Sequence, residues 1–106
     1  MLTICFRYES NGKAERTLRC CIGKRLYEAA GRPEYLSIQR IGGELVLSQL
    51  DRQGPEASPG YRLLPYKDGH RFWCSEASDL IRRDAGSYEV EVRGEDRRIY
   101  VSERRR

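Results

Sequence analysis

One stretch of the sequence decides the fold: residues 22–33 read IGKRLYEAAGRP. Most residues between Lys24 and Ala30 are good helix formers, Gly31 stands where a helix end favours glycine, and Pro33 forbids much continuation. The stretch therefore predicts a helix of about two turns over residues 23–31. The segments on either side of it have apolar patterns typical of strands, so we expect the helix to join two β-hairpins.

Four strands are predicted around this helix. Leu2–Tyr8 alternates apolar and polar side chains with the period of a half-buried strand. Asn11-Gly12 supplies a tight turn to its partner, and Gly42-Gly43 supplies the turn of the second hairpin. The predicted strands span residues 2–8, 15–22, 35–41 and 44–50. Residues 1–50 are thus expected to form one β-β-α-β-β unit.

A second unit follows a linker. Residues 51–60 are rich in glycine and proline, as linkers are, and residues 61–102 then repeat the order of the first half. Ser75 suits the N-cap of a helix over Glu76–Asp84. Residues 103–106 form a basic tail that we expect to fray. The predicted strands of this half span residues 61–66, 70–74, 88–93 and 98–102.

The two halves repeat at a constant offset of 54 residues from the return strand onward, whereas the first hairpin turns, Asn11-Gly12 and Asp68-Gly69, lie 57 residues apart. A unit of about 50 residues buries too little apolar surface to be comfortable alone. We therefore expect one integrated domain, mostly β with two short helices, in which duplicated units close a single core with pseudo-twofold symmetry. The matched apolar pairs are Leu18/Phe72, Cys20/Cys74, Leu26/Leu80, Tyr27/Ile81, Leu36/Val90, Ile38/Val92, Leu45/Ile99, Val46/Tyr100 and Leu47/Val101.

Residues 20–47 resemble the AbrB-like swapped-hairpin family. That family has a strand ending in isoleucine, then Pro-Lys-x-[Ile/Leu]-Arg-Glu-x-Leu-Gly, then a turn with proline and an alternating hairpin. The chain follows this frame from Ile22 to Leu47, with Gly23 in place of the proline and Tyr27 in place of the arginine. The resemblance, in its tandem-repeat form, implies a swapped-hairpin-like barrel.

The resemblance also implies a function, because the family is best known for DNA-binding transcription regulators and antitoxins. On the return strand, Arg16 and Arg19 should project away from the core pair Leu18 and Cys20. Phosphate contacts would make the affinity salt-dependent, and an arginine could pair with guanine edges in the major groove. The alternative is that these charges are merely solvated surface. The candidate DNA contacts are Lys13, Arg16, Arg19, Lys24 and Arg25.

The charge is unevenly distributed over the repeat. The chain of 106 residues has 20 Lys and Arg against 16 Asp and Glu, a net charge of +4. Residues 7–32 alone carry a local surplus of that size, whereas the second half is acidic until its last three arginines. The first unit is therefore the one expected to contact DNA.

The second half lacks the matching cations. Arg19 corresponds to Trp73, while Lys24 and Arg25 correspond to a serine and an aspartate. Either one unit contacts DNA beside a scaffold unit, or two chains associate as a homodimer, or the fold serves another task. Trp73 is the best candidate for an exposed aromatic, with a core position as the alternative. We expect contacts with a ligand or partner at His70, Arg71 and Trp73.

Several classes of function are disfavoured. The sequence has no phosphate-binding glycine loop and no metalloprotease or hydrolase motif, so we expect neither an enzyme nor a cofactor. No apolar run is long enough to span a bilayer, which favours a cytoplasmic protein without a membrane partner. The cysteines lack C-x-x-C spacing and are expected to be small apolar core residues rather than metal ligands. These cysteines are Cys5, Cys20, Cys21 and Cys74.

A rival reading comes from another class of protein. A compact, duplicated and asymmetric domain would also suit a small inhibitor or sequestering protein of a phage or other mobile element. Its target would be a host defence protein or a nucleotide second messenger. Salt-sensitive retention on DNA separates the two readings, because only the regulator requires it.

Overall fold

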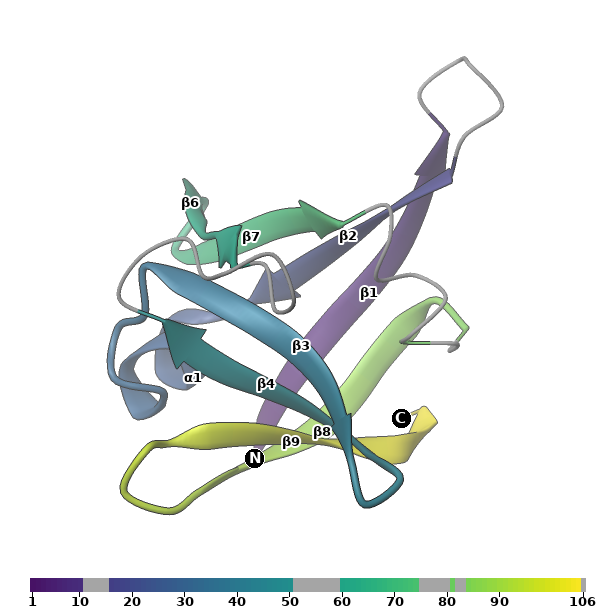
Figure 1. The fold of residues 1–106 in the computed structure, drawn as a ribbon. Coiled ribbons are helices and arrows are strands. Elements are labelled where there is room, and N and C mark those ends of the chain that lie inside the picture. Colours follow the sequence, from purple (N-terminus) through teal and green to yellow (C-terminus); the bar gives the residue numbers. More distant parts are fainter. Residues whose placement is uncertain (11–15, 51–59, 75–80, 82–83, 106) are drawn as a thin grey trace.

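The chain folds into one antiparallel sheet that curls into a nearly closed barrel (Figure 1). The computed structural model describes residues 1–10, 16–50, 60–74, 81 and 84–105. One short helix, α1 (Lys24–Ala29), is complete within this part of the chain. The strands are β1 (Leu2–Ser10), β2 (Arg16–Ile22), β3 (Tyr35–Ile41), β4 (Glu44–Leu50), β5 (Tyr61–Arg62), β6 (Leu64–Tyr66), β7 (Gly69–Cys74), β8 (Gly86–Arg93) and β9 (Arg98–Arg105).

The strand order brings the two edges of the sheet together. Neighbouring strands follow the order β5-β3-β4-β9-β8-β1-β2-β7-β6. The edge strands β5 and β6 are consecutive in the chain and are separated by Leu63 alone. Hairpins from the two halves of the chain alternate around the barrel, since β1 and β2 lie between β8 and β7.

Four ladders join the first half of the chain to the second, and two of them lie within the repeated segments. The ladder between β2 and β7 contains the pair Arg19 and Trp73, and the ladder between β4 and β9 contains the pair Val46 and Tyr100. The flanking pairs are Leu18/Cys74 and Cys20/Phe72 in the first ladder and Leu45/Val101 and Leu47/Ile99 in the second. Both ladders thus place apolar residues of both halves on the inner face.

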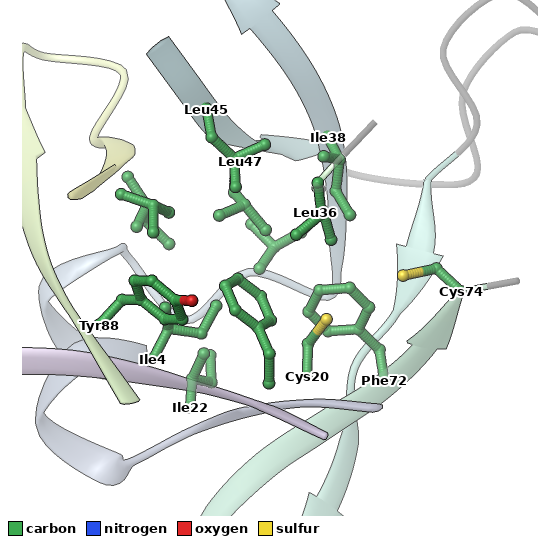
Figure 2. Packing of buried hydrophobic residues seen from close by; sticks show 14 of the residues in the cluster. Ile4, Cys20, Ile22, Leu36, Ile38, Leu45, Leu47, Phe72, Cys74 and Tyr88 are labelled. Carbon is green, nitrogen blue, oxygen red and sulfur yellow. The ribbon is translucent and has the colours of Figure 1, made fainter. Parts of the chain in front are cut away.

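Apolar side chains from all around the barrel fill its interior (Figure 2). In β1, Ile4 and Phe6 are fully buried, whereas Arg7 is exposed, as the alternation of a strand requires. The Phe6 ring lies 5.5 Å from that of Tyr88, and Leu26 brings α1 into the same cluster. Burial of each such side chain stabilises the fold by about 1.5–3 kcal/mol.

The helix α1 ends as its sequence predicts. The backbone N–H of Arg32 donates to the carbonyl oxygen of Tyr27 (2.9 Å), and Gly31 adopts a left-handed φ of 86°. At its N-terminus the cap residue is Gly23, which has no side chain to cap the helix. Glycine is also required at Gly69, the first residue of β7, because a Cβ there would clash with the backbone carbonyl of Ile22.

The second half departs from the expected strand bounds. The strand predicted over residues 61–66 is interrupted at Leu63, whose backbone N–H donates to the carbonyl oxygen of Glu34 (2.9 Å). The prediction of a frayed tail from Glu103 is wrong as far as Arg105. There β9 continues, and the Arg105 guanidinium donates to the carbonyl oxygen of Ala85 (3.0 Å).

Other predictions fall outside the described residues. They include the Asn11-Gly12 turn, the linker up to residue 59 and most of the second helix. Of that helix, Ile81 is helical and buried, and its carbonyl oxygen accepts a hydrogen bond from Arg40 (3.0 Å). No helix among the described residues is long and apolar enough to cross a membrane.

Candidate nucleic-acid interface

A group of basic and aromatic side chains occupies the outer side of β1, β2, β7 and β6, which we call the arginine–aromatic face. The ladder registers align Arg7 with Arg19 and Arg19 with Trp73, one row away from Arg71. Since the neighbouring rows on these strands point into the core, the alternation of the strands sends this set outward. The face consists of Arg7, Glu9, Arg19, Tyr66, Lys67, Arg71 and Trp73.

Arg71 is held between two aromatic rings. Its guanidinium carbon lies 3.9 Å from the centroid of Tyr66 and 4.6 Å from that of Trp73. Tyr66 also has Lys67 Nζ at 5.3 Å and the Arg19 guanidinium at 5.9 Å. Such cation–π contacts contribute about 0.5–1 kcal/mol each at exposed sites. They restrict the Arg71 side chain, while its guanidinium N–H groups remain hydrogen-bond donors.

Glu9 connects the arginine row with the tryptophan. Its carboxylate lies 3.0 Å from Arg19 Nη1 and accepts a hydrogen bond from Trp73 Nε1 (3.2 Å). The Arg19 side chain retains only 16% of its exposure, while that of Glu9 retains 38%. Trp73 is therefore half-buried on the outer face rather than a core residue.

The face has more cations than carboxylates. Among the described residues, Arg19 is the one cation of this face with a carboxylate within ion-pair distance. Arg71 has aromatic partners instead, while Arg7 and Lys67 are exposed. The result is a local surplus of positive charge beside two aromatic rings.

A groove leads from this face to the start of α1. One pocket of about 240 Å³ is lined by Cys21, Tyr66 and His70, among others. A second pocket of about 290 Å³ is lined by Lys24 and Arg25. The two pockets share Thr3, Gly23 and Asp68, so they adjoin. Cations at a helix start oppose the helix dipole, so helix stability does not explain Lys24 and Arg25.

His70 lines the groove, and its imidazole stacks on an aromatic ring of α1. It stacks on Tyr27 of α1 with ring centroids 3.7 Å apart and planes at 17°. Its Nδ1 is buried and has no hydrogen-bond partner among the described residues. Burial lowers the pKa of His70, so the neutral imidazole is favoured there.

The structure divides the predicted site residues into groups. It brings Arg19 and Arg71 near the Tyr66 ring, and Trp73 near Arg71 and Glu9. Lys24, Arg25 and His70 lie along the groove. Lys13 lies outside the described residues. Arg16 is placed only by its backbone position in β2, opposite Ser10, and it shares the register of Leu18, so the prediction that Arg16 and Arg19 lie on one side of the strand is wrong.

Sequence reasoning missed Tyr66 and Glu9. Tyr66 had a signal, because it follows the alternation of β6 and stands beside Lys67. Glu9 had none, because its contact with Trp73 joins residues that are 64 positions apart.

The cysteine prediction is wrong for two of the four residues. Cys20 and Cys74 are buried, and burial raises the pKa of the Cys20 thiol, but Cys5 and Cys21 are half-buried. These two face each other across β1 and β2 and line the groove. No three His, Cys, Asp or Glu side chains in the described part of the chain come close enough to hold a metal ion.

Comparisons with family models, curated proteins and solved structures give no match for this chain.

Proposed function

We propose that this protein binds DNA through the arginine–aromatic face. The observation that carries the proposal is the Arg71 guanidinium, which lies between Tyr66 and Trp73 without a carboxylate partner among the described residues. The two rings lie against the guanidinium without using its N–H groups as a carboxylate would, so these can donate toward a phosphate. A planar, preoriented fork loses less side-chain freedom on binding than a free arginine would.

The other cations of the face extend this contact. Arg7 is exposed beside Arg19 in the ladder, and Lys67 stands at the turn between β6 and β7. Lys24 and Arg25 continue the positive charge along the groove. Neutralising phosphates with such residues releases counterions and supplies affinity that falls with salt.

We also propose that the barrel is a duplicated, swapped-hairpin-like structure. At the offset of 54, Leu45 pairs with the equivalent of Leu47, and Leu47 pairs with the equivalent of Leu45. Val46 pairs with its own equivalent, Tyr100, and Arg19 pairs with its own equivalent, Trp73. A twofold axis through each ladder would produce this reciprocity, as it does in symmetric dimers.

The β3–β4 and β8–β9 hairpins differ in turn length, so the offset of 54 does not hold across both. The β3–β4 hairpin turns at Gly42-Gly43, whereas the β8–β9 hairpin pairs Arg93 with Arg98 around four residues. With β4 matched to β9 at the offset of 54, the longer turn therefore moves β8 by two residues against β3. The interleaved order of the hairpins nevertheless supports a tandem AbrB-like arrangement, and with it the role of a transcriptional regulator or antitoxin-type repressor.

A protein partner is the second candidate. Leu64 retains 41% of its exposure and pairs with Arg71 beside Tyr66 and Trp73. Tryptophan, tyrosine and arginine are the residues most enriched at the energetic centres of protein interfaces. An acidic surface on a host defence protein would fit this face in the inhibitor reading.

The test uses the single tryptophan as a reporter. Trp73 is the only tryptophan of the chain, so a ligand on this face should change its fluorescence. We expect mixed-sequence DNA to bind with an affinity that falls steeply with salt. Charge reversal of Arg19, Lys24 and Arg25 should weaken this binding. A DNA affinity that changes neither with salt concentration nor with the charge reversal would contradict the proposal.

A further inference from the structure

We infer that the arginine–aromatic face binds an unpaired DNA strand in preference to a duplex. The inference rests on the DNA binding proposed above and names the form of DNA. It follows from the width of the sheet, from the pocket at Tyr66 and from the path of the groove.

The sheet is too wide to enter a DNA groove. Four adjacent strands, β1, β2, β7 and β6, form this face. At the usual strand spacing their outer members lie about 14 Å apart before side chains are added. The major groove is about 12 Å wide and admits a helix or a two-stranded ribbon. On a duplex, Arg71 and Lys67 could therefore reach phosphates while the aromatic rings stay unused.

An unpaired base can stack on the Tyr66 ring, which a paired base in a duplex cannot reach. Tyr66 lines the pocket of about 240 Å³, together with Cys5 and Cys21. The pocket is small and mostly apolar in character, which suits the flat face of one base. Stacking of a base on an aromatic ring changes affinity about ten- to a hundredfold. Because every base has a π-face, this contact tolerates any sequence.

The groove beyond Tyr66 favours a flexible chain. It runs past Gly23 and Asp68 to Lys24 and Arg25 at the start of α1. Asp68 is the one acidic residue that lines it among the described residues, and Lys67 precedes Asp68 in the same turn. A single strand can bend from the face into this groove, whereas a duplex is stiff over about 150 base pairs.

A regulator of this kind would hold DNA where its strands are separated. Arg71 would contact the phosphate, and Tyr66 would stack on the neighbouring base. Lys24 and Arg25 would hold the backbone further along. The proposed repressor role would then depend on an opened segment rather than on a paired operator.

The test compares two forms of one sequence. A labelled DNA of about 16 nucleotides, the upper site size for small single-strand binders, is titrated as a single strand and as a duplex at the same salt. Fluorescence anisotropy gives both affinities, and Trp73 emission reports contact with the face. We expect the single strand to bind at least about tenfold more tightly and to quench Trp73 more strongly.

Matched variants assign the preference to the ring. Tyr66→Leu should reduce single-strand affinity about tenfold and leave duplex affinity nearly unchanged, whereas Tyr66→Phe should keep the preference. Tyr100→Leu removes a comparable ring from β9, outside the face, and should change neither. Circular dichroism confirms that each variant is folded. The comparison of strand and duplex on the unaltered protein decides the question even if Tyr66→Leu does not fold.

The outcomes separate the two proposals. Duplex binding as tight as single-strand binding overturns this inference and leaves DNA binding intact. Equal losses for both forms in Tyr66→Leu also overturn it, because the ring would then not distinguish them. Absence of salt-sensitive binding to either form overturns both proposals.

Discussion

The barrel has two outer faces that use the same contact in different surroundings. On the arginine–aromatic face, Arg71 lies against Tyr66 and Trp73, and among the described residues its guanidinium has no carboxylate partner. On the outer side of β3, β4, β9 and β8, which we call the paired face, Arg93 stacks on Tyr100 at 4.3 Å. The stack itself is therefore common to both faces and does not mark a site.

Carboxylates make the difference between the two faces. Arg93 has Glu91 at 3.0 Å and Glu44 at 3.6 Å, and the hydrogen bond with Glu91 raises the pKa of Arg93. Arg98 on the same face has Asp96 at 2.7 Å. These cations are neutralised within the chain. The partners of an arginine, rather than the number of arginines, therefore indicate which face can take an anionic ligand.

The largest expected effect is a loss of stability at one of two corresponding ladder pairs, Val46/Tyr100 on the paired face and Arg19/Trp73 on the arginine–aromatic face. Val46 is fully buried although it lies on the outer side, whereas Arg19 is a partly exposed cation at the corresponding position of the other ladder. Val46→Asp would bury an unpaired carboxylate and should lower the free energy of unfolding by about 3 kcal/mol. Urea denaturation measures this loss.

The matched change is Arg19→Leu. It removes one partly exposed ion pair and should cost less than about 1 kcal/mol. Equal losses in the two variants would mean that the ladders do not differ in this way.

The next effect concerns DNA affinity. Arg71→Gln keeps much of the side-chain length but removes the charge-assisted hydrogen bonds to phosphate, and should weaken DNA binding by about 1.5–3 kcal/mol. Arg93→Gln makes the same change on the paired face and should leave affinity unaltered. Anisotropy titration at fixed salt measures both. A similar loss in the two variants would remove the distinction between the faces.

A smaller effect of opposite sign is expected at Glu9. Glu9→Gln removes the one carboxylate of the arginine–aromatic face and releases Arg19. DNA binding should strengthen by up to about 1 kcal/mol, while the free energy of unfolding should fall by no more than that. Glu91→Gln is the control on the paired face. Weaker binding in Glu9→Gln would show that the carboxylate positions Arg19 for the ligand.

The smallest effect is the pH dependence from His70. Its pKa is lowered in the folded protein, so the unfolded chain binds the proton more readily and stability falls as pH drops below about 6.5. His70→Gln should flatten this decline between pH 7.5 and 5.5, above the range in which the carboxylates titrate. Thermal unfolding across that range measures it. An unchanged slope would show that other groups cause the decline.

Local patterns predicted the hairpins and missed the face. The bounds of Tyr35–Ile41 and Glu44–Leu50 are confirmed, because alternation and the Gly42-Gly43 turn act over a few residues. Trp73 could not be assigned from sequence, because its surroundings depend on the pairing of β7 with β2. Non-local pairing carries no local pattern.

The adjacency of Cys20 and Cys21 already indicates that the four cysteines cannot all point into the core. Cys20 and Cys21 are neighbours in one strand, so their side chains must point to opposite faces. Only one of the two can therefore point into the barrel interior, and the other depends on what covers the outer side. The structure accordingly buries Cys20 and leaves Cys21 half-buried.

The interruption at Leu63 limits how another chain can pair with the edges of the sheet. It leaves edge strands of two and three residues, β5 and β6, at the ends of a nine-stranded sheet. Long unpaired edges invite another chain to add a strand, which leads to aggregation or to recognition by β-augmentation. Strands this short offer few backbone groups for such addition, so a partner at β5 or β6 must be recognised by side chains.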